Sequence, residues 1–111
     1  MRHVLIYGKQ PSYDKYKYKE DENMKISVIG SINMDQTVTA ERIPLKGETL
    51  HGDTLSYIPG GKGANQAVAM ARLGADVEMF GCVGDDSHGQ ALIDNLAEKG
   101  VKTGNIRKIR R

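Results

Sequence analysis

The sequence predicts an α/β fold in which a mostly parallel sheet is flanked by helices, and three observations indicate it. A β-branched apolar run at 25–30 ends in glycine, as is typical of a buried parallel strand. A glycine-rich segment at 60–63 leads directly into an alanine-rich run with the pattern of a helix. Strand and helix patterns then alternate along the rest of the chain, which favours a sheet with helices packed on it.

The elements can be placed in order by these patterns. Strands are expected at 25–30, 36–40, 54–58, 76–82 and 105–109, and helices at 64–73 and 88–99. Gly74 and Gly100 follow the two helices directly and are expected to end them in the left-handed conformation, with Val101 adding an apolar contact.

The second helix must pack on the sheet, because its apolar side chains fall on one face: Leu92, Ile93, Leu96 and Ala97. With one phenylalanine and no tryptophan, the core is expected to rest on Ile, Val, Leu, Met and Ala.

The segment from Gly60 to Asn65 predicts a cradle for a polar ligand. Its glycines allow a ligand to approach the backbone, and the helix that follows presents free N–H groups. Lys62 adds an ammonium donor, and Asn65 adds an amide that can donate and accept. The plainer alternative is a turn followed by a helix start.

Two phosphate-binding fingerprints fit this segment poorly. A Walker A loop requires serine or threonine after the lysine, where this chain has Gly63. A dinucleotide fingerprint beginning at Gly61 would need a small residue at the position of Gln66, for close helix packing.

A second polar group follows the first strand. In an extended segment Ser31, Asn33 and Asp35 fall on one side, just beyond the carboxyl end of a strand, where open α/β sheets bind ligands. An amide and a carboxylate there suit a polyhydroxyl ligand. The alternative is an Asx-turn, in which both side chains bond only to local backbone.

A pair of acidic residues, Asp85 and Asp86, precedes the second helix. We interpret them as carboxylates that complement the helix dipole rather than as a catalytic base. The spacing of Ser87 and Gln90 predicts a capping box at this helix start.

Composition argues against several other classes of function. The net charge of the 111-residue chain is only +2, so the basic end at 107–111 is interpreted as solvated rather than as a nucleic-acid surface. The histidines have no metal-ligand spacing with Cys82, so a metal site is not expected. A single cysteine, without a signal-peptide core or a membrane span, favours the cytoplasm.

Residues 1–23 form a charged leader that is expected to be mobile, because it lacks an apolar stripe. Alternating Tyr and Lys at 13–19 could stack on single-stranded nucleic acid, but the acidic residues that follow argue against it.

Taken together, the motifs resemble a known family. They are Gly30-Ser31-Ile32-Asn33-Met34-Asp35, Pro44-Leu45-Lys46-Gly47-Glu48-Thr49, Gly60-Gly61-Lys62-Gly63-Ala64-Asn65-Gln66-Ala67, Gly74-Ala75, and Gly81-Cys82-Val83-Gly84-Asp85-Asp86 with Gly89. In this order and spacing, residues 24–109 resemble the amino-terminal part of the ribokinases, within the PfkB-type carbohydrate kinases.

The resemblance implies ATP-dependent phosphorylation of D-ribose, or a similar pentose, at the 5-hydroxyl, with magnesium and a monovalent cation such as potassium. It implies that the sugar, rather than a phosphate, is contacted by Asn33, Asp35, Gly61, Lys62 and Asn65. It also implies that the strands at 36–40 and 54–58 belong to a small lid sheet that covers the sugar and pairs subunits into a homo-oligomer.

The family's Gly-Ala-Gly-Asp anion hole, catalytic aspartate and nucleotide pocket belong to a later half that residues 24–111 do not include. We therefore expect a truncated segment of the ribokinase-like fold that holds sugar-binding residues, has no catalytic residue and is inactive alone.

Two alternatives stay open. One is a non-catalytic module that binds a sugar or oligomerises through the lid strands. The other is a small dinucleotide-binding α/β protein, which needs an acidic residue about twenty positions after the glycines. Asp85 and Asp86 fit that spacing poorly.

Overall fold

The computed structural model describes residues 25–110, so the predicted leader at 1–23 lies outside the described residues. All seven expected elements are present in the expected order. They are β1 (Lys25–Ile29), β2 (Asn33–Thr39), β3 (Thr54–Gly60), α1 (Lys62–Arg72), β4 (Asp76–Gly84), α2 (Ser87–Glu98) and β5 (Lys102–Ile109).

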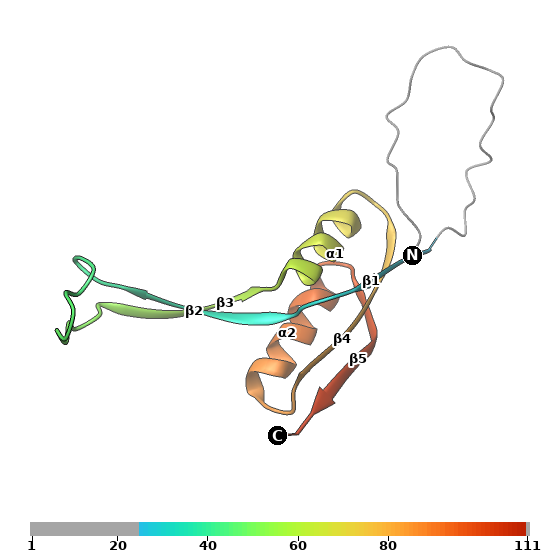
Figure 1. The fold of residues 1–111 in the computed structure, drawn as a ribbon. Helices are drawn as coiled ribbons and strands as arrows, with labels where there is room; N and C mark the ends of the chain where they lie inside the picture. Colours follow the sequence, from blue (N-terminus) through green and yellow to red (C-terminus); the bar gives the residue numbers. More distant parts are fainter. Residues whose placement is uncertain (1–24, 111) are drawn as a thin grey trace, which may run out of the picture.

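Three of the strands form a parallel sheet in the order β1-β4-β5, with helices on one face (Figure 1). Helix α1 contacts β1 and β4, and α2 contacts β4 and β5. The buried side chains of β4 are Val77, Met79 and Val83, which alternate along the strand and so share the face under the helices. This confirms the predicted α/β class.

The core between the sheet and the helices consists of aliphatic side chains and methionine, as expected. Its buried members are Val28, Ile32, Ala64, Ala67, Val77, Met79, Val83, Leu92, Leu96 and Val101. Phe80 is only half-buried. Ala97, expected on the packed face of α2, is exposed, because the helix is buried along the narrower stripe of Leu92 and Leu96.

The opposite face of the parallel sheet is open, which corrects the expectation of a strand buried on both faces at 25–30. Val28 lies in the core, whereas Ile29, its neighbour on the other face, is 84% exposed. Polar pairs occupy part of this face: Lys102 bonds to Asp76 at 2.9 Å, and Asn105 bonds to Glu78 at 2.6 Å. The two helices pack on the other side, so among residues 25–110 the strands are covered on one face only.

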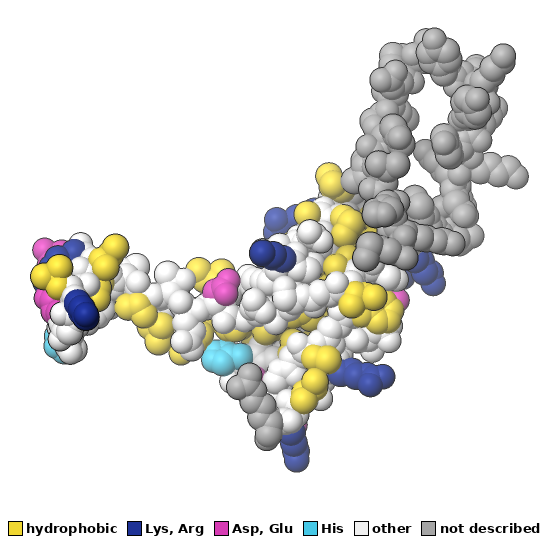
Figure 2. Space-filling model, in the orientation of Figure 1, with side chains coloured by type: hydrophobic (Ala, Val, Ile, Leu, Met, Phe, Trp, Pro, Cys, Tyr) yellow, Lys and Arg dark blue, Asp and Glu magenta, His cyan; other side chains and the backbone are white. Residues whose placement is uncertain are grey.

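Strands β2 and β3 form a separate antiparallel pair that projects from the body (Figure 1). We refer to β2, β3 and the loop between them as the arm. The arm strands are longer than predicted, since β2 begins three residues before 36 and β3 ends two residues after 58. Apolar side chains show along the arm in Figure 2. Val38 and Leu55 of the arm strands are more than half exposed.

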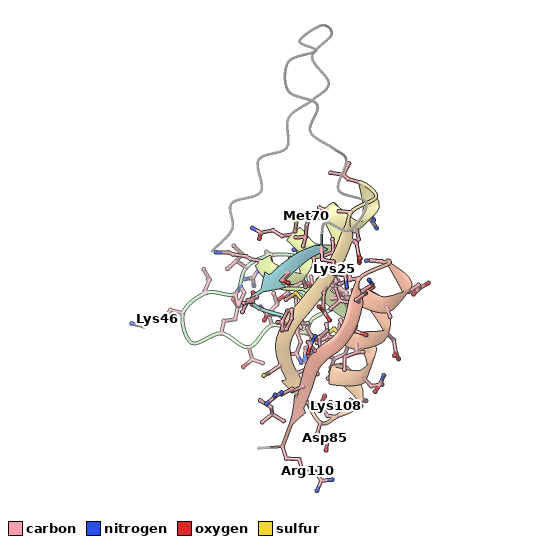
Figure 3. The ribbon with its side chains drawn as sticks, turned by 90° about the vertical axis from the view of Figure 1, so that its right-hand side faces the viewer. Lys25, Lys46, Met70, Asp85, Lys108 and Arg110 are labelled. Carbon is pink, nitrogen blue, oxygen red and sulfur yellow. The ribbon has the colours of Figure 1, made fainter. Side chains whose placement is uncertain are left out.

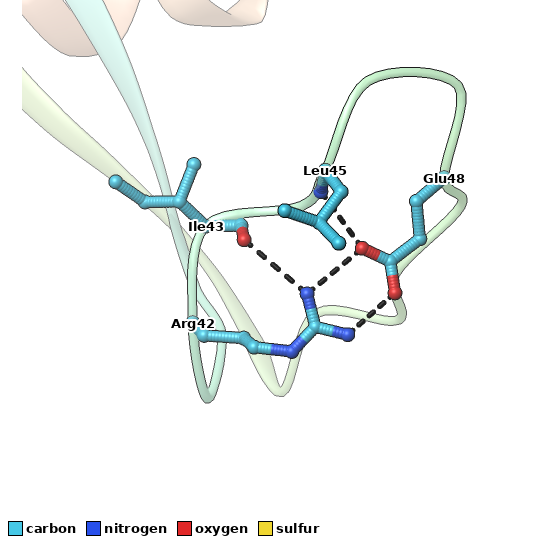
Figure 4. Close-up of polar contacts among 4 residues, drawn as sticks. All are labelled: Arg42, Ile43, Leu45 and Glu48. Atoms are coloured by element: carbon cyan, nitrogen blue, oxygen red, sulfur yellow. Dashed lines mark hydrogen bonds and ion pairs between the residues drawn. The ribbon is translucent and has the colours of Figure 1, made fainter.

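The loop at the tip of the arm is held by a charged network (Figure 4). The guanidinium of Arg42 donates to both carboxylate oxygens of Glu48, at 2.8 and 2.5 Å. The backbone N–H of Leu45 also donates to Glu48, at 2.7 Å. These bonds raise the pKa of Arg42 and lower the pKa of Glu48.

Both helices end as predicted, at a glycine with positive φ: 90° at Gly74 and 86° at Gly100. The N–H of Val101 donates to the carbonyl of Leu96 at 3.0 Å, and the buried Val101 side chain adds the apolar contact. Neither described helix is long and apolar enough to cross a membrane.

The predicted capping box at Ser87 is wrong by one residue. Asp86 is the N-cap of α2, and its carboxylate accepts from the N–H of Gly89 at 2.7 Å. Aspartate is an effective N-cap, so the helix begins at Ser87 itself. The interpretation of Asp86 as a helix-start carboxylate is confirmed.

Candidate functional site

The candidate site lies where the segment after β1 meets the start of α1. These two segments touch through backbone, since a Cβ at Gly63 would lie 2.8 Å from the Cα of Gly30. The N–H of Ala64 donates to the carbonyl of Ser31 at 3.1 Å, which fastens the first turn of α1 to the entry of β2. Glycine at both contact positions therefore allows the helix N-terminus to reach the arm's base.

Two more glycines make room within the site. Gly61 is the N-cap of α1 with φ 100°, and a Cβ there would lie 2.5 Å from the carbonyl oxygen of Ser31. A Cβ at Gly60 would lie 2.5 Å from Oδ2 of Asp35. The Asp35 carboxylate therefore lies directly over the backbone of Gly60, in space that a side chain would fill.

Asn33 and Asp35 lie in β2, on the same face of the arm. Asn33 is opposite Gly60 and Asp35 is opposite Ile58 in the ladder with β3. Both are exposed, and neither side chain has a hydrogen bond among the described residues. The alternative of an Asx-turn is therefore wrong, because strand pairing extends the backbone that such a turn would have to fold.

Lys62 and Asn65 lie in the first turn of α1, and both are exposed. Within residues 25–110, no hydrogen bond or ion pair uses their side chains, and none uses the backbone N–H of Lys62 or Gly63. Asn65 also lines a cavity of about 270 Å³ between α1 and α2, together with Gly60 and Pro59.

The structure places the five predicted site residues in β2 and at the start of α1, which meet where a Cβ at Gly61 would lie 3.0 Å from the backbone N of Asn33. Lys62 follows Gly61 directly, whereas Asn65 faces the neighbouring cavity between the helices. The junction offers a carboxylate acceptor, an ammonium donor, two amides and free backbone N–H groups. Such a mixture of donors and acceptors suits adjacent hydroxyl groups of a small polyol.

The sequence did not reveal the roles of two residues, Gly60 and His88. Gly60 was assigned to the cradle for its conformational freedom, but its role is to leave space for Asp35. His88 was considered only as a metal ligand, whereas the structure places its ring against Tyr57 of the arm. A glycine opposite a polar strand residue is a signal that could have found the first. The second involves residues 31 positions apart, which no local pattern connects.

The acidic pair before α2 lies away from this junction. Asp85 accepts from Arg110 at 2.8 Å, and its N–H donates to the carbonyl of Ile109 at 3.0 Å (Figure 3). Lys108 donates to Gln90 of α2. Part of the predicted solvated basic end is therefore paired with the start of α2.

The glycine segment also lacks the setting of a dinucleotide fingerprint. Such a fingerprint follows a strand of a parallel βαβ unit, whereas Gly61 follows β3, a strand of the antiparallel arm. Within the described residues, no three His, Cys, Asp or Glu side chains are grouped closely enough to hold a metal ion.

The sequence matches a known family of proteins. The model of the pfkB family of carbohydrate kinases matches residues 23–109. Over 78 residues the chain is 56% identical to a ribokinase of Bacillus subtilis, and this match covers 70% of this chain and 27% of that protein. It is 41% identical over 86 residues to a mouse (Mus musculus) ribokinase, covering 78% of this chain and 27% of that protein.

Solved structures show the same fold. A structure of Arabidopsis thaliana ribokinase complexed with ribose and ATP superposes with a TM-score of 0.70 at 36% identity, over 78% of this chain and 28% of that one. A ribokinase of Cryptococcus neoformans in complex with ADP gives a TM-score of 0.69 at 37% identity, over 78% and 27%. The chain therefore spans little more than a quarter of the ribokinases that it matches. With its glycine-lined junction, its arm and a family match over most of its length, this chain belongs to the pfkB family of carbohydrate kinases.

Proposed function

We propose that the chain is the sugar-binding segment of a ribokinase-type kinase, which phosphorylates the 5-hydroxyl of D-ribose with ATP. The observation that carries the proposal is the junction itself, where β2 meets the start of α1 and where the polar groups have no partner within residues 25–110. The 56% identity to a Bacillus subtilis ribokinase supports ribose, or a similar pentose, as the sugar.

Each proposed contact follows from the chemistry of the group. Asp35, held over Gly60, accepts hydrogen bonds from adjacent sugar hydroxyls. Asn33 and Asn65 donate and accept through their amides, and Lys62 donates from a flexible stem. The backbone N–H groups of Lys62 and Gly63 complete a rim of donors at the helix N-terminus.

Transfer of the phosphoryl group requires more than these contacts. The transferred group needs donors placed to stabilise its developing charge, a bound nucleotide and divalent cations. We propose that the chain orients the sugar but does not phosphorylate it alone.

The direct experiment incubates the 111-residue chain with ribose, ATP and magnesium and measures ribose 5-phosphate in a coupled assay. Product at the level of a no-enzyme control is expected. Product above that level would show that the chain carries a phosphoryl-transfer site of its own. Ribose affinity, measured separately by calorimetry, tests the binding half of the proposal.

The sharpest test of the sugar site compares two variants. Asp35→Ala should weaken ribose binding more than Asn65→Ala, because a charged acceptor contributes roughly 1.5 to 3 kcal/mol and a neutral one about 0.5 to 1.5 kcal/mol. Thr37→Ala, two residues further along the same face of β2, is the matched control. If Asp35→Ala binds ribose as tightly as the parent and remains folded, Asp35 is not a sugar contact.

A second function is favoured by the arm. Val38 and Leu55 face each other across its two strands and are 59% and 54% exposed. Exposed apolar side chains on two strands that project from the body favour association with another molecule. We propose that a second copy of the chain covers this face.

Separately, we expect the protein to be located in the cytoplasm.

A further inference from the structure

A pair of aromatic rings joins the arm to the start of α2. Tyr57 of β3 and His88 of α2 have ring centroids 4.7 Å apart and planes inclined by 36°. This separation lies in the range of attractive aromatic pairs, which adopt offset or tilted arrangements. Tyr57 belongs to the arm and His88 to the body, so their contact links these two parts of the molecule.

The two faces of the arm have different roles. Neighbouring residues along a strand point to opposite faces, so Tyr57 lies on the face that Asp35 and Asn33 do not share. Met34 and Pro59, on the Tyr57 face, lie at the arm's base, where Met34 packs against the core and Pro59 lines the cavity beside Leu92 of α2. Two of the proposed sugar contacts, Asn33 and Asp35, are thus on one face of the arm, and the supports of the arm are on the other.

The backbone on either side of His88 is held in place at the start of α2. The carboxylate of Asp86 caps the helix through the N–H of Gly89. Gly89 is buried, and a Cβ there would collide with the carbonyl oxygen of Gly84 at the end of β4. The first turn of α2 is therefore fixed against the sheet and provides a firm point for the Tyr57 ring.

Beyond this contact the arm has less support. Val38 and Leu55, which follow Gln36 and Tyr57 outward on the same face, are more than half exposed. A two-stranded pair of this kind is marginally stable alone, so its angle depends on the contacts at its base. The Tyr57–His88 pair lies two residues further along the arm than Pro59. A contact at that distance limits the angle between the arm and the body more than the contacts at the arm's base do.

We propose that His88 is a positioning residue, which stacks on Tyr57 to hold the arm at the angle where Asp35 and Asn33 lie beside Gly60 and Gly61, at the start of α1. Loss of the stack lets the arm sample other angles. Apparent sugar affinity then falls in proportion to the fraction of molecules in the competent arrangement. This inference rests on the proposed ribose site, but the position of the arm can be measured without a sugar.

The first measurement follows arm geometry alone. Cys82 is the chain's single cysteine and is exposed on the body, and Ile43→Cys places a second thiol at the exposed tip of the arm. Spin labels at the two thiols report a distance distribution. His88→Ala and Tyr57→Ala should each broaden it, whereas His88→Tyr and Tyr57→Phe, which keep a ring, should leave it narrow.

The second measurement is ribose affinity of the same variants by calorimetry. His88→Ala and Tyr57→Ala should bind roughly three- to tenfold more weakly, the range that an aromatic pair covers. The double variant should bind no more weakly than either single variant, because both remove one contact. Retention of affinity by His88→Tyr would separate positioning from any polar role of the imidazole.

The outcomes separate the two proposals. A narrow, unchanged distance distribution in His88→Ala overturns the positioning role, whatever the sugar result. A broadened distribution with unchanged ribose affinity overturns its link to the sugar site. If the parent binds no ribose while the distribution broadens, the proposed function fails but the arm contact stands.

Discussion

At the residue scale, the site depends on where side chains are missing. Asp35 can lie over the arm's backbone because Gly60 has no Cβ, and α1 can begin beside β2 because Gly61 and Gly63 have none. Each of these glycines has a distinct neighbour, so a methyl group would disturb a different contact at each. The carboxylate of Asp35 is the contact most directly tied to sugar recognition.

A methyl group at Gly60 should therefore act through Asp35. In Gly60→Ala the carboxylate must move, and ribose affinity should fall roughly tenfold or more, as on loss of a charged acceptor. Gly104→Ala is the matched control, because a Cβ there meets no atom within 4 Å. Calorimetry on both variants checks this. Equal affinities would show that Asp35 does not need its present position.

The network at the arm's tip predicts a response to acid. Glu48 accepts hydrogen bonds from Arg42 and from the N–H of Leu45, and these bonds hold the pKa of Glu48 below its ordinary range. A lowered pKa means that the network is intact at neutral pH and is lost as the pH falls through that pKa. Proton shifts of the Leu45 amide, followed by NMR on acidification, should change in that window. In Glu48→Gln the transition should disappear.

At the element scale, helix ends decide how the body is assembled. Both helices end in the same backbone motif, with a glycine after the last turn and a following residue bonded back into the helix. The start of α2 is different, because it uses Asp86 as its cap rather than the predicted Ser87. Both serine and aspartate are good N-caps, so sequence alone could not choose between neighbouring positions.

The cap assignment gives a direct comparison of two substitutions. Asp86→Ala should lower the free energy of unfolding by roughly 0.5 to 2 kcal/mol, because the N–H of Gly89 loses its acceptor. Ser87→Ala, at the first helical position, should have little effect. Urea unfolding followed by circular dichroism measures both. A larger loss in Ser87→Ala would place the cap one residue later.

At the scale of the whole molecule, two surfaces are left uncovered within the described residues. One is the open face of the parallel sheet, and the other is the face of the arm that carries Val38 and Leu55. Parallel sheets are ordinarily covered on both faces, so the first surface calls for a further layer. The second surface is available to a partner, because the arm projects from the body (Figure 1).

We expect the chain to associate in solution through the arm. Leu55→Asp should reduce association measured by light scattering, because a charge would be buried among apolar side chains. Thr37→Asp, on the opposite face of the arm, is the control and should change it little. A sharp monomer for the parent at high concentration would contradict the prediction.

The order and type of every element were predictable, because each has a local signal in its hydrophobic period or its glycines. The same holds for the core composition, which follows from the small number of aromatic residues. Asn33, Asp35, Gly61, Lys62 and Asn65 were named as sugar contacts from the resemblance of their motifs to those of the ribokinases. Their role in sugar binding remains a prediction.

What the sequence determined by itself is local: strand and helix periods, glycine ends and the two polar motifs. Only the tertiary structure decided how these parts meet. It showed that Gly60 leaves room for Asp35, that one sheet face is open, and that Tyr57 stacks on His88. These features join residues distant along the chain, and their energies depend on packing between elements rather than on the propensity of any one segment.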